Sequence, residues 1–395
     1  MKKLIPIVLL ICSCYSCATD KKEENISRID LKSFEETTLK FKDKTFFQNC
    51  FLVKLEASEK SMLGRINQVE VFKEYIYIHD GQTSRILIFD KSGKYLSDVG
   101  SKGRGPEEYV SASIFFINPY DKSVNVIDPL NSNVIKYSLT GKFINKIKYE
   151  NSNMSFVNKI TMINENELFC YSTINWRDDA AFSVLNATDL SLKETILSYP
   201  YRSEKQMNTN LYPTPFSFND GKVIFITPFS NQLLSYKNGE TEPYIYVDND
   251  KEEISSELLS TKLKANDDDF TSVMSQVADE GKYNTGISTI YENSRFLYCE
   301  YRVERHQAAM ILWDKKEKKG FFIKPATGLN FHGMATVYEN TAVCVLHELT
   351  IASYQDRISK DENAKALYPK ELLDVLNSYN KEVDNPILVF YEFNS

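Results

Sequence analysis

The chain is poor in the residues that build common catalytic and metal-binding motifs. Its 395 residues include 14 glycines, 12 prolines, two tryptophans and four histidines. The histidines stand in four separate segments, and neither a His-Glu-x-x-His nor a Gly-x-Ser-x-Gly motif occurs. The sequence therefore lacks the local signatures of zinc hydrolases and serine hydrolases, and it predicts no cofactor.

An excess of positive charge is also missing. The chain has 47 Lys+Arg against 54 Asp+Glu, a net charge of -7. Nucleic-acid binding needs a broad positive field, so we exclude a nucleic-acid partner. The 42% of hydrophobic and 26% of charged residues are typical of a globular protein.

Long apolar runs are absent as well. The run Leu4–Ile11 follows two lysines and is too short for a permanent membrane span. Small residues and cysteines come next, at 12–17. This order predicts a signal peptide over residues 1–17 and resembles a bacterial lipoprotein signal, in which the cysteine after the cut receives the lipid.

Two cysteines fit that lipidation site. A serine precedes both Cys17 and Cys14; Cys14 has the more usual Ile11 upstream but would leave a very short signal, so we prefer Cys17. A plain secretory peptide is the alternative. Residues 18–45 are expected to form a tether and N-terminal segment. We expect export and a lipid anchor in the outer membrane, on its periplasmic or cell-surface side, with no other membrane contact.

The remaining cysteines are predicted to be free thiols in the core. Each lies in or beside a short apolar, strand-like run, where a thiol acts as a small hydrophobic filler. Disulfide pairing is the alternative in an exported protein, and no spacing fits a zinc site. These residues are Cys50, Cys170, Cys299 and Cys344.

A repeat of 48 residues indicates the fold. Asp80 and the turn at Gly93 recur without a gap as Asp128 and Gly141, each pair flanked by matching apolar strands. Each unit reads as strand, Asp-containing turn, strand, glycine turn, strand. Four weaker copies follow. Six such units predict an all-β, six-bladed β-propeller over residues 46–395, with a β-sandwich or two separate β domains as alternatives.

The same pattern predicts how the ring closes. The last unit ends one strand short, at 387–391, and an extra strand at 50–55 precedes the first unit. We expect this N-terminal strand to complete the last blade.

Four segments carry a family resemblance. Phe51–Glu56, Ser61–Ile66, Gly103–Tyr109 and Asn385–Tyr391 resemble the six-bladed β-propeller lipoproteins of Gram-negative bacteria, which are NHL-like or TolB-like. The resemblance implies the fold and a location in the cell envelope. It implies no catalytic residues.

One face of the predicted wheel is the better place for a binding site. It carries the turns between the second and third strand of each blade and the connections between blades; we call it the loop face. Two helical insertions, at about 251–284 and 349–384, fall there. They contain an amphipathic pattern from Phe270 to Val277 and a helix that Pro369 opens. They could form a lid or a partner surface, or only shield sheet edges.

The candidate ligand-binding residues come from these loops. Trp176, Arg177 and Asp178 suit a sugar or an anionic peptide, although an exposed salt-bridged turn is the alternative. The charged hairpin near position 304 could equally be solvated, and the glycines beside Arg104 could serve only the backbone turn. The full set is Arg104, Trp176, Arg177, Asp178, Arg302, Glu304, His306, His332 and His347.

Three functional hypotheses follow. The first is a non-enzymatic binding module for an unknown protein or glycan partner in the envelope. The second is an envelope hydrolase or lyase whose axial metal would be held by His306, His332 or His347. The third is a structural envelope component.

Overall fold

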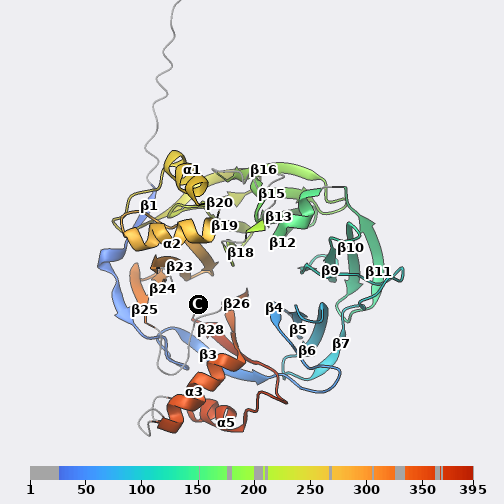
Figure 1. Cartoon of the computed structure of the whole chain (residues 1–395). Coiled ribbons are helices and arrows are strands. Elements are labelled where there is room, and N and C mark those ends of the chain that lie inside the picture. The colour runs from blue at the N-terminus through green and yellow to red at the C-terminus, as the bar shows by residue number, and fades with distance from the viewer. Residues whose placement is uncertain are drawn as a thin grey trace, which may run out of the picture.

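The structure is a computed structural model in which six small antiparallel sheets surround one axis (Figure 1). It describes residues 26–150, 152–175, 180–199, 208–209, 212–266, 269–304, 307–324, 334–360, 365 and 368–394. In each blade the first strand lies nearest the axis and the following strands lie progressively further out. The predicted six-bladed β-propeller is confirmed.

Blades 1 to 3 occupy the first half of the chain. Blade 1 consists of β4 (Ile66–Phe72), β5 (Tyr75–Asp80), β6 (Arg85–Asp90) and β7 (Tyr95–Asp98). Blade 2 consists of β8 (Ile114–Asn118), β9 (Ser123–Asp128), β10 (Asn133–Ser138) and β11 (Phe143–Lys148). Blade 3 follows the 3-10 turn η2 (Ser152–Phe156) and consists of β12 (Val157–Asn164), β13 (Glu167–Ser172), β15 (Ala180–Asn186) and β16 (Leu192–Ser198), with a separate pair formed by β14 (Ile174–Asn175) and β17 (Asn208–Thr209).

Blades 4 to 6 recruit strands from the N-terminal segment. Blade 4 consists of β18 (Phe216–Asn219), β19 (Lys222–Ile226), β20 (Gln232–Lys237) and β21 (Glu240–Asp248), with β1 (Ser27–Asp30) added outside. Blade 5 consists of β22 (Ile287–Glu292), β23 (Phe296–Glu304), β24 (Gln307–Asp314) and β25 (Lys319–Ile323), with β2 (Glu35–Thr37) added outside. Blade 6 consists of β26 (Met334–Tyr338), β27 (Thr341–Leu346), β28 (Ile387–Phe393) and β3 (Phe47–Lys54).

The repeated Asp and Gly residues of blades 1 and 2 have structural roles. The Asp80 carboxylate accepts hydrogen bonds from the backbone N–H groups of Gly64 (3.1 Å) and Arg65 (3.0 Å), so it ties its own turn to the chain entering the blade. Gly93 has φ 87°, and a Cβ there would lie 2.1 Å from the carbonyl oxygen of Lys54 in the neighbouring blade. A glycine is therefore required by both conformation and space.

The ring closes as predicted. Strand β3 pairs antiparallel with β28, with Val53 opposite Leu388. The rings of Phe51 and Phe390 stack with centroids 4.8 Å apart. The Asn385 side chain accepts a hydrogen bond from the Leu63 backbone N–H (2.8 Å), which fixes the connection into blade 1. The first and last strands of the wheel thus belong to one sheet.

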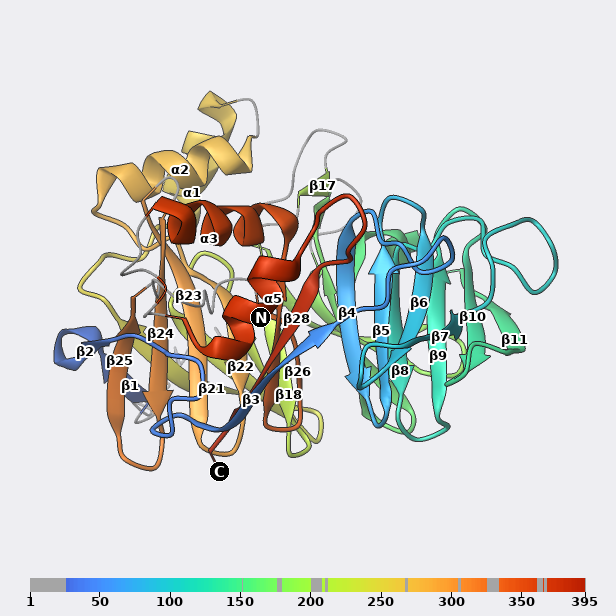
Figure 2. The same ribbon diagram turned by 90° about the horizontal axis from the view of Figure 1, so that it is seen from below.

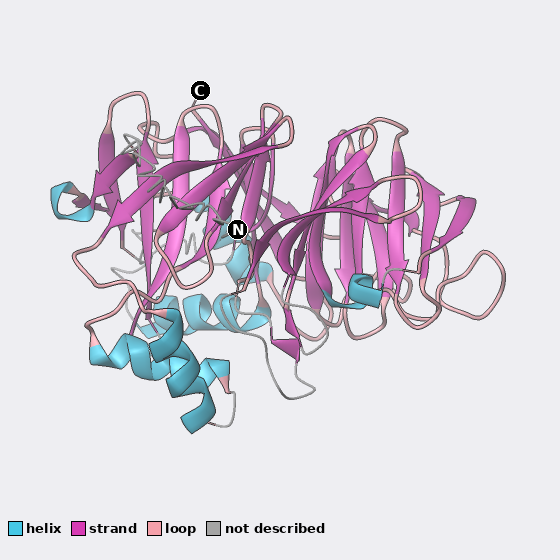
Figure 3. Ribbon diagram, turned by 90° about the horizontal axis from the view of Figure 1, so that it is seen from above, coloured by secondary structure: helices cyan, strands magenta, loops and turns pink. Residues whose placement is uncertain are grey.

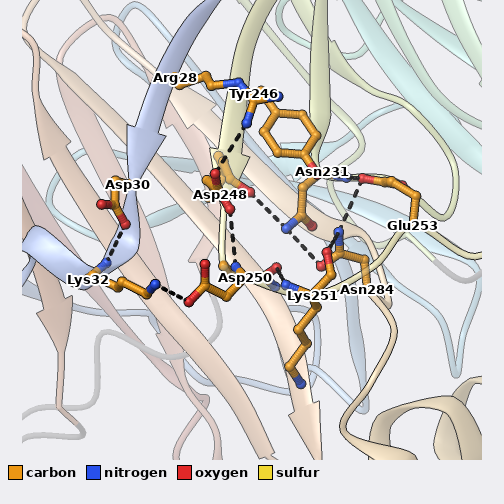
Figure 4. Close-up of polar contacts among 12 residues, drawn as sticks. Arg28, Asp30, Lys32, Asn231, Tyr246, Asp248, Asp250, Lys251, Glu253 and Asn284 are labelled. Atoms are coloured by element: carbon orange, nitrogen blue, oxygen red, sulfur yellow. Dashed lines mark hydrogen bonds and ion pairs between the residues drawn. The ribbon is translucent and has the colours of Figure 1, made fainter.

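Residues before β3 continue around the outside of the wheel. Strand β1 pairs in parallel with β21, and β2 pairs in parallel with β25, with the 3-10 turn η1 (Leu31–Ser33) between them. Figure 4 shows the polar contacts at β1: Arg28 pairs with Asp248 at 3.2 Å, and Lys32 pairs with Asp250. Strands in this segment were not predicted from the sequence.

Helices lie on the loop face (Figures 2 and 3). The first insertion holds α1 (Ser256–Ala265) and α2 (Phe270–Glu280), and the second holds α3 (Glu348–Lys360) and α5 (Lys370–Ser378). Helices α2 and α5 match the predicted patterns, whereas α1 and α3 were not predicted. None of the helices in the described part of the chain is long and apolar enough to cross a membrane.

The predicted free cysteines are confirmed. Cys50, Cys170, Cys299 and Cys344 are buried and unpaired by disulfides. Burial raises the pKa of each of these thiols, to about 11 for Cys50. They are core fillers rather than reactive thiols.

Candidate functional site

Arg104 is exposed on the connection between blades 1 and 2. The Glu108 carboxylate of this connection accepts a hydrogen bond from the Gly105 N–H at 2.7 Å, and a Cβ on Gly103 would lie 1.9 Å from that carboxylate. Tyr109, which ends the motif, is fully buried. The glycines therefore shape a tight, self-closed turn.

Most of the other predicted residues belong to parts of the chain that the structure does not describe. Trp176, Arg177, Asp178, His306 and His332 lie outside the described residues. Arg302 and Glu304 belong to strand β23, but their side chains lie outside the described part of the structure.

His347 is exposed and directly precedes α3, where its carbonyl oxygen accepts a hydrogen bond from the Ile351 N–H (3.0 Å). Of the predicted site residues, Arg104 and His347 are thus the ones with described side-chain environments, and they belong to different blades. In the described residues, no three His, Cys, Asp or Glu side chains gather where they could share a metal ion.

Two cavities lie around the axis, between the innermost strands; the lining of the first is mainly polar and that of the second is mixed. The first has a volume of about 340 Å³ and is lined by residues near the beginnings of innermost strands, including Asn67, Ser113 and Thr214. The second has about 380 Å³ and is lined by residues near their ends, including Asp220 and Glu339. Because each innermost strand runs away from the loop face, the first cavity opens at the loop face and the second at the opposite face.

Three residues line both cavities and mark the level where they meet: Glu70 on β4, Lys159 on β12 and Thr336 on β26. Glu70 accepts one hydrogen bond on each carboxyl oxygen, from the Gln68 amide (3.1 Å) and from the Thr336 hydroxyl (3.2 Å). Burial raises the pKa of Glu70, and these hydrogen bonds and Lys159 act in the opposite direction.

At the level where the two cavities meet, the Lys159 side chain extends from β12 toward Phe216 on β18 and Tyr291 on β22. Its ammonium donates to the Phe216 carbonyl at 3.1 Å and lies 4.9 Å from the Phe216 ring centre and 5.7 Å from that of Tyr291. The Lys159 residue is half-buried and lines both cavities. Burial lowers the pKa of Lys159 to about 8, against the opposing effect of Glu70.

His79 lines the loop-face cavity from β5. Its side chain is 2% exposed, and neither ring nitrogen has a hydrogen-bond partner among the described residues. Burial lowers the pKa of His79 to about 4, so the ring is neutral at pH 7. A neutral imidazole has one donor and one acceptor, and both are unused here.

The opposite cavity contains a different charged group. Glu292 on β22 is 4% exposed and pairs with the Lys315 ammonium at 2.9 Å. The Tyr244 hydroxyl donates a hydrogen bond to the same carboxylate. The buried carboxylate at this end of the axis is therefore paired with a positive charge and accepts a hydrogen bond.

Sequence reasoning missed Glu70 and Lys159. Each is a charged residue that alternates with buried apolar residues in an innermost strand: Glu70 lies between Val69 and Val71, which are buried between blades. The sequence feature that could have identified them is a charged residue at a strand position that faces the axis. Such a position can be recognised only once the innermost strands are known.

The fold and these cavities define a six-bladed β-propeller with two cavities on its axis, of which the loop-face cavity is mainly polar. The chain belongs to the family described as domain of unknown function DUF4934, whose model matches residues 26–392. No curated protein matches the chain.

Two solved structures share the fold at low sequence identity. A "putative exported protein" from Bacteroides fragilis is 18% identical, with a TM-score of 0.73, covering 93% of this chain and 100% of the other. A member of the DUF4221 family from Bacteroides vulgatus is 11% identical, with a TM-score of 0.53, covering 88% and 97%. At these identities the likeness shows the fold alone.

Proposed function

We propose that this protein is an exported, lipid-anchored β-propeller that binds a small polar ligand at the loop-face end of its axis. The observation that carries the proposal is the His79 ring, which is buried beside a polar cavity and whose two nitrogens have no hydrogen-bond partner in the described part of the chain. Buried polar groups without partners are rare in folded proteins, and a bound ligand would satisfy them.

The location is part of the same proposal. The N-terminal signal with Cys17 or Cys14 supports export and lipidation, and the Bacteroides fragilis relative is described as a "putative exported protein". Kinship with NHL-like and TolB-like lipoprotein propellers, and an outer-membrane anchor, belong to this proposal too. No catalysis is part of it.

Ligand binding is tested with two variants of one strand. Ala335 and Val337 lie two residues apart on β26 and line the loop-face and the opposite cavity respectively. The full chain is dialysed against small molecules extracted from the cell envelope, and retained compounds are identified by mass spectrometry. We expect a compound that wild type and Val337→Phe retain and Ala335→Phe loses. Equal retention by all three proteins, or none by wild type, would contradict the proposal.

The lipid anchor has its own test. A fatty-acid analogue fed to growing cells should label wild type and Cys14→Ser, and should not label Cys17→Ser. Label that survives Cys17→Ser and disappears with Cys14→Ser would assign the lipid to Cys14, and an unlabelled wild type would remove the anchor from the proposal.

A further inference from the structure

Glu70 and Lys159, at the level where the two cavities meet, differ in how many of their hydrogen-bonding positions are used by the protein. Both oxygens of Glu70 already accept a hydrogen bond from protein. An ammonium group has three N–H donors, and in the described structure Lys159 uses one of them, on the Phe216 carbonyl. Its other neighbours are aromatic ring faces, which attract a cation but are not carboxylates.

This imbalance selects an anion over a cation. A cationic ligand would have to compete with Gln68 and Thr336 for Glu70 and would approach Lys159 against its charge. An anionic group would find two unused N–H donors on Lys159 in surroundings where charge interactions are stronger than in water. Burial also favours the uncharged form of Glu70, which reduces the repulsion that an anion would meet.

His79 adds the second requirement. It lines the same cavity as Lys159 and offers one donor and one acceptor while carrying no charge at pH 7. A larger molecule can hydrogen-bond to both ring nitrogens of His79 and still place a charged group against Lys159. A small inorganic anion is less able to make all of these contacts. The cavity, at about 340 Å³, has room for a small organic molecule.

We propose that the loop-face cavity binds a small organic carboxylate, whose charged group contacts the Lys159 ammonium and whose neutral polar groups hydrogen-bond to His79. The inference rests on the proposed function and adds the chemical class of the ligand. It gives both unsatisfied side chains a partner within one molecule.

The test uses matched probes that differ in charge. Glucuronate is compared with glucose, and N-acetylalanine with its amide, by calorimetric titration of the full chain. We expect at least one acid to bind about tenfold more tightly than its neutral partner, the difference a single charged contact typically supplies. This first arm needs no variant and so does not depend on any mutant folding.

Variants then locate the contact. Lys159→Met should weaken binding of the acid about tenfold or more and leave the neutral partner unaffected. Lys222→Met is the matched control, because Lys222 begins β19 outside the loop-face cavity. Acids and neutral partners binding alike, neither acid binding at millimolar concentration, or Lys159→Met binding the acid as wild type does would each overturn the inference.

The two proposals can fail separately. If the dialysis experiment retains only uncharged compounds in an Ala335-dependent way, the loop-face site stands and the carboxylate assignment is wrong. If it retains nothing, the site itself is wrong.

Discussion

The two ends of the axis hold buried polar groups in opposite states. At the opposite face, Glu292 is paired with Lys315 and accepts a hydrogen bond from Tyr244. At the loop face, neither ring nitrogen of His79 has a partner among the described residues. Lys159, at the level where the two cavities meet, uses one donor of three in the described structure. A protein interior normally satisfies its polar groups. Under the proposed function, this contrast separates an end whose buried charge is paired within the protein from an end whose polar groups a ligand would satisfy.

The largest expected effect comes from breaking the satisfied end. Glu292→Leu removes the partner of a largely buried ammonium, and we expect it to lower the free energy of unfolding by about 3 kcal/mol. Chemical denaturation at pH 7.5 measures this. The double variant Glu292→Leu/Lys315→Met is the control and should recover most of the loss. A single variant as stable as wild type would show that Glu292 is not the stabilising contact described.

The unsatisfied end should make stability depend on pH. The folded pKa of His79, about 4, lies below its unfolded value of 6.5. The unfolded chain therefore binds the proton first, and folding is destabilised as pH falls below 6.5, by about 2 kcal/mol at pH 5 relative to pH 8. Comparing wild type with His79→Leu isolates this contribution, because other groups titrate in both proteins. An unchanged difference between the two proteins from pH 8 to 5 would contradict a buried neutral His79.

Ligand binding should depend on pH in the alkaline range. Lys159, with a pKa of about 8, loses its charge between pH 7 and 9, so the affinity for a carboxylate probe should fall about tenfold. The other titratable groups that line its two cavities are His79, Glu70, Tyr291, Asp220, Glu292, Tyr338 and Glu339. Of these, His79 is already neutral at pH 7 and Tyr291 has a raised pKa, so neither titrates in this range. Constant affinity from pH 7 to 9 would argue against a Lys159 contact.

The smallest effect has the opposite sign from the first. At pH 8, His79→Leu exchanges an unpartnered buried ring for an apolar side chain, and we expect the free energy of unfolding to rise by about 1 kcal/mol. Ligand binding should weaken at the same time. A destabilised His79→Leu would mean that the ring has a structural role in the unliganded protein.

Much of the wheel was predictable because its signals are local. The 48-residue repeat, the Asp80 turn and the Gly93 turn each reflect a requirement of a single hairpin. The closing strand was predictable because the last unit lacked one. Strands β1 and β2 were not, since Ser27–Asp30 and Glu35–Thr37 are short and polar and gain their conformation only by pairing with blades 4 and 5.

The candidate site could not be predicted in the same way. Long polar loops such as the one holding Arg104 attract attention in a sequence, yet that loop is closed on itself. Glu70 and Lys159 come from strands that are far apart in the chain. Which face of each strand points toward the axis is determined by the assembled ring. Nothing in their local sequence shows that they line the same cavities.

One measurement tests the central claim most directly. In the full chain carrying isotope-labelled histidine, the NMR signals of the His79 ring can be assigned by their loss in His79→Leu. We predict that glucuronate or N-acetylalanine shifts these signals in wild type and in Val337→Phe, and does not shift them in Ala335→Phe. Ring signals that stay in place when a probe binds, or that move equally in Ala335→Phe, would contradict a ligand site at the loop-face end of the axis.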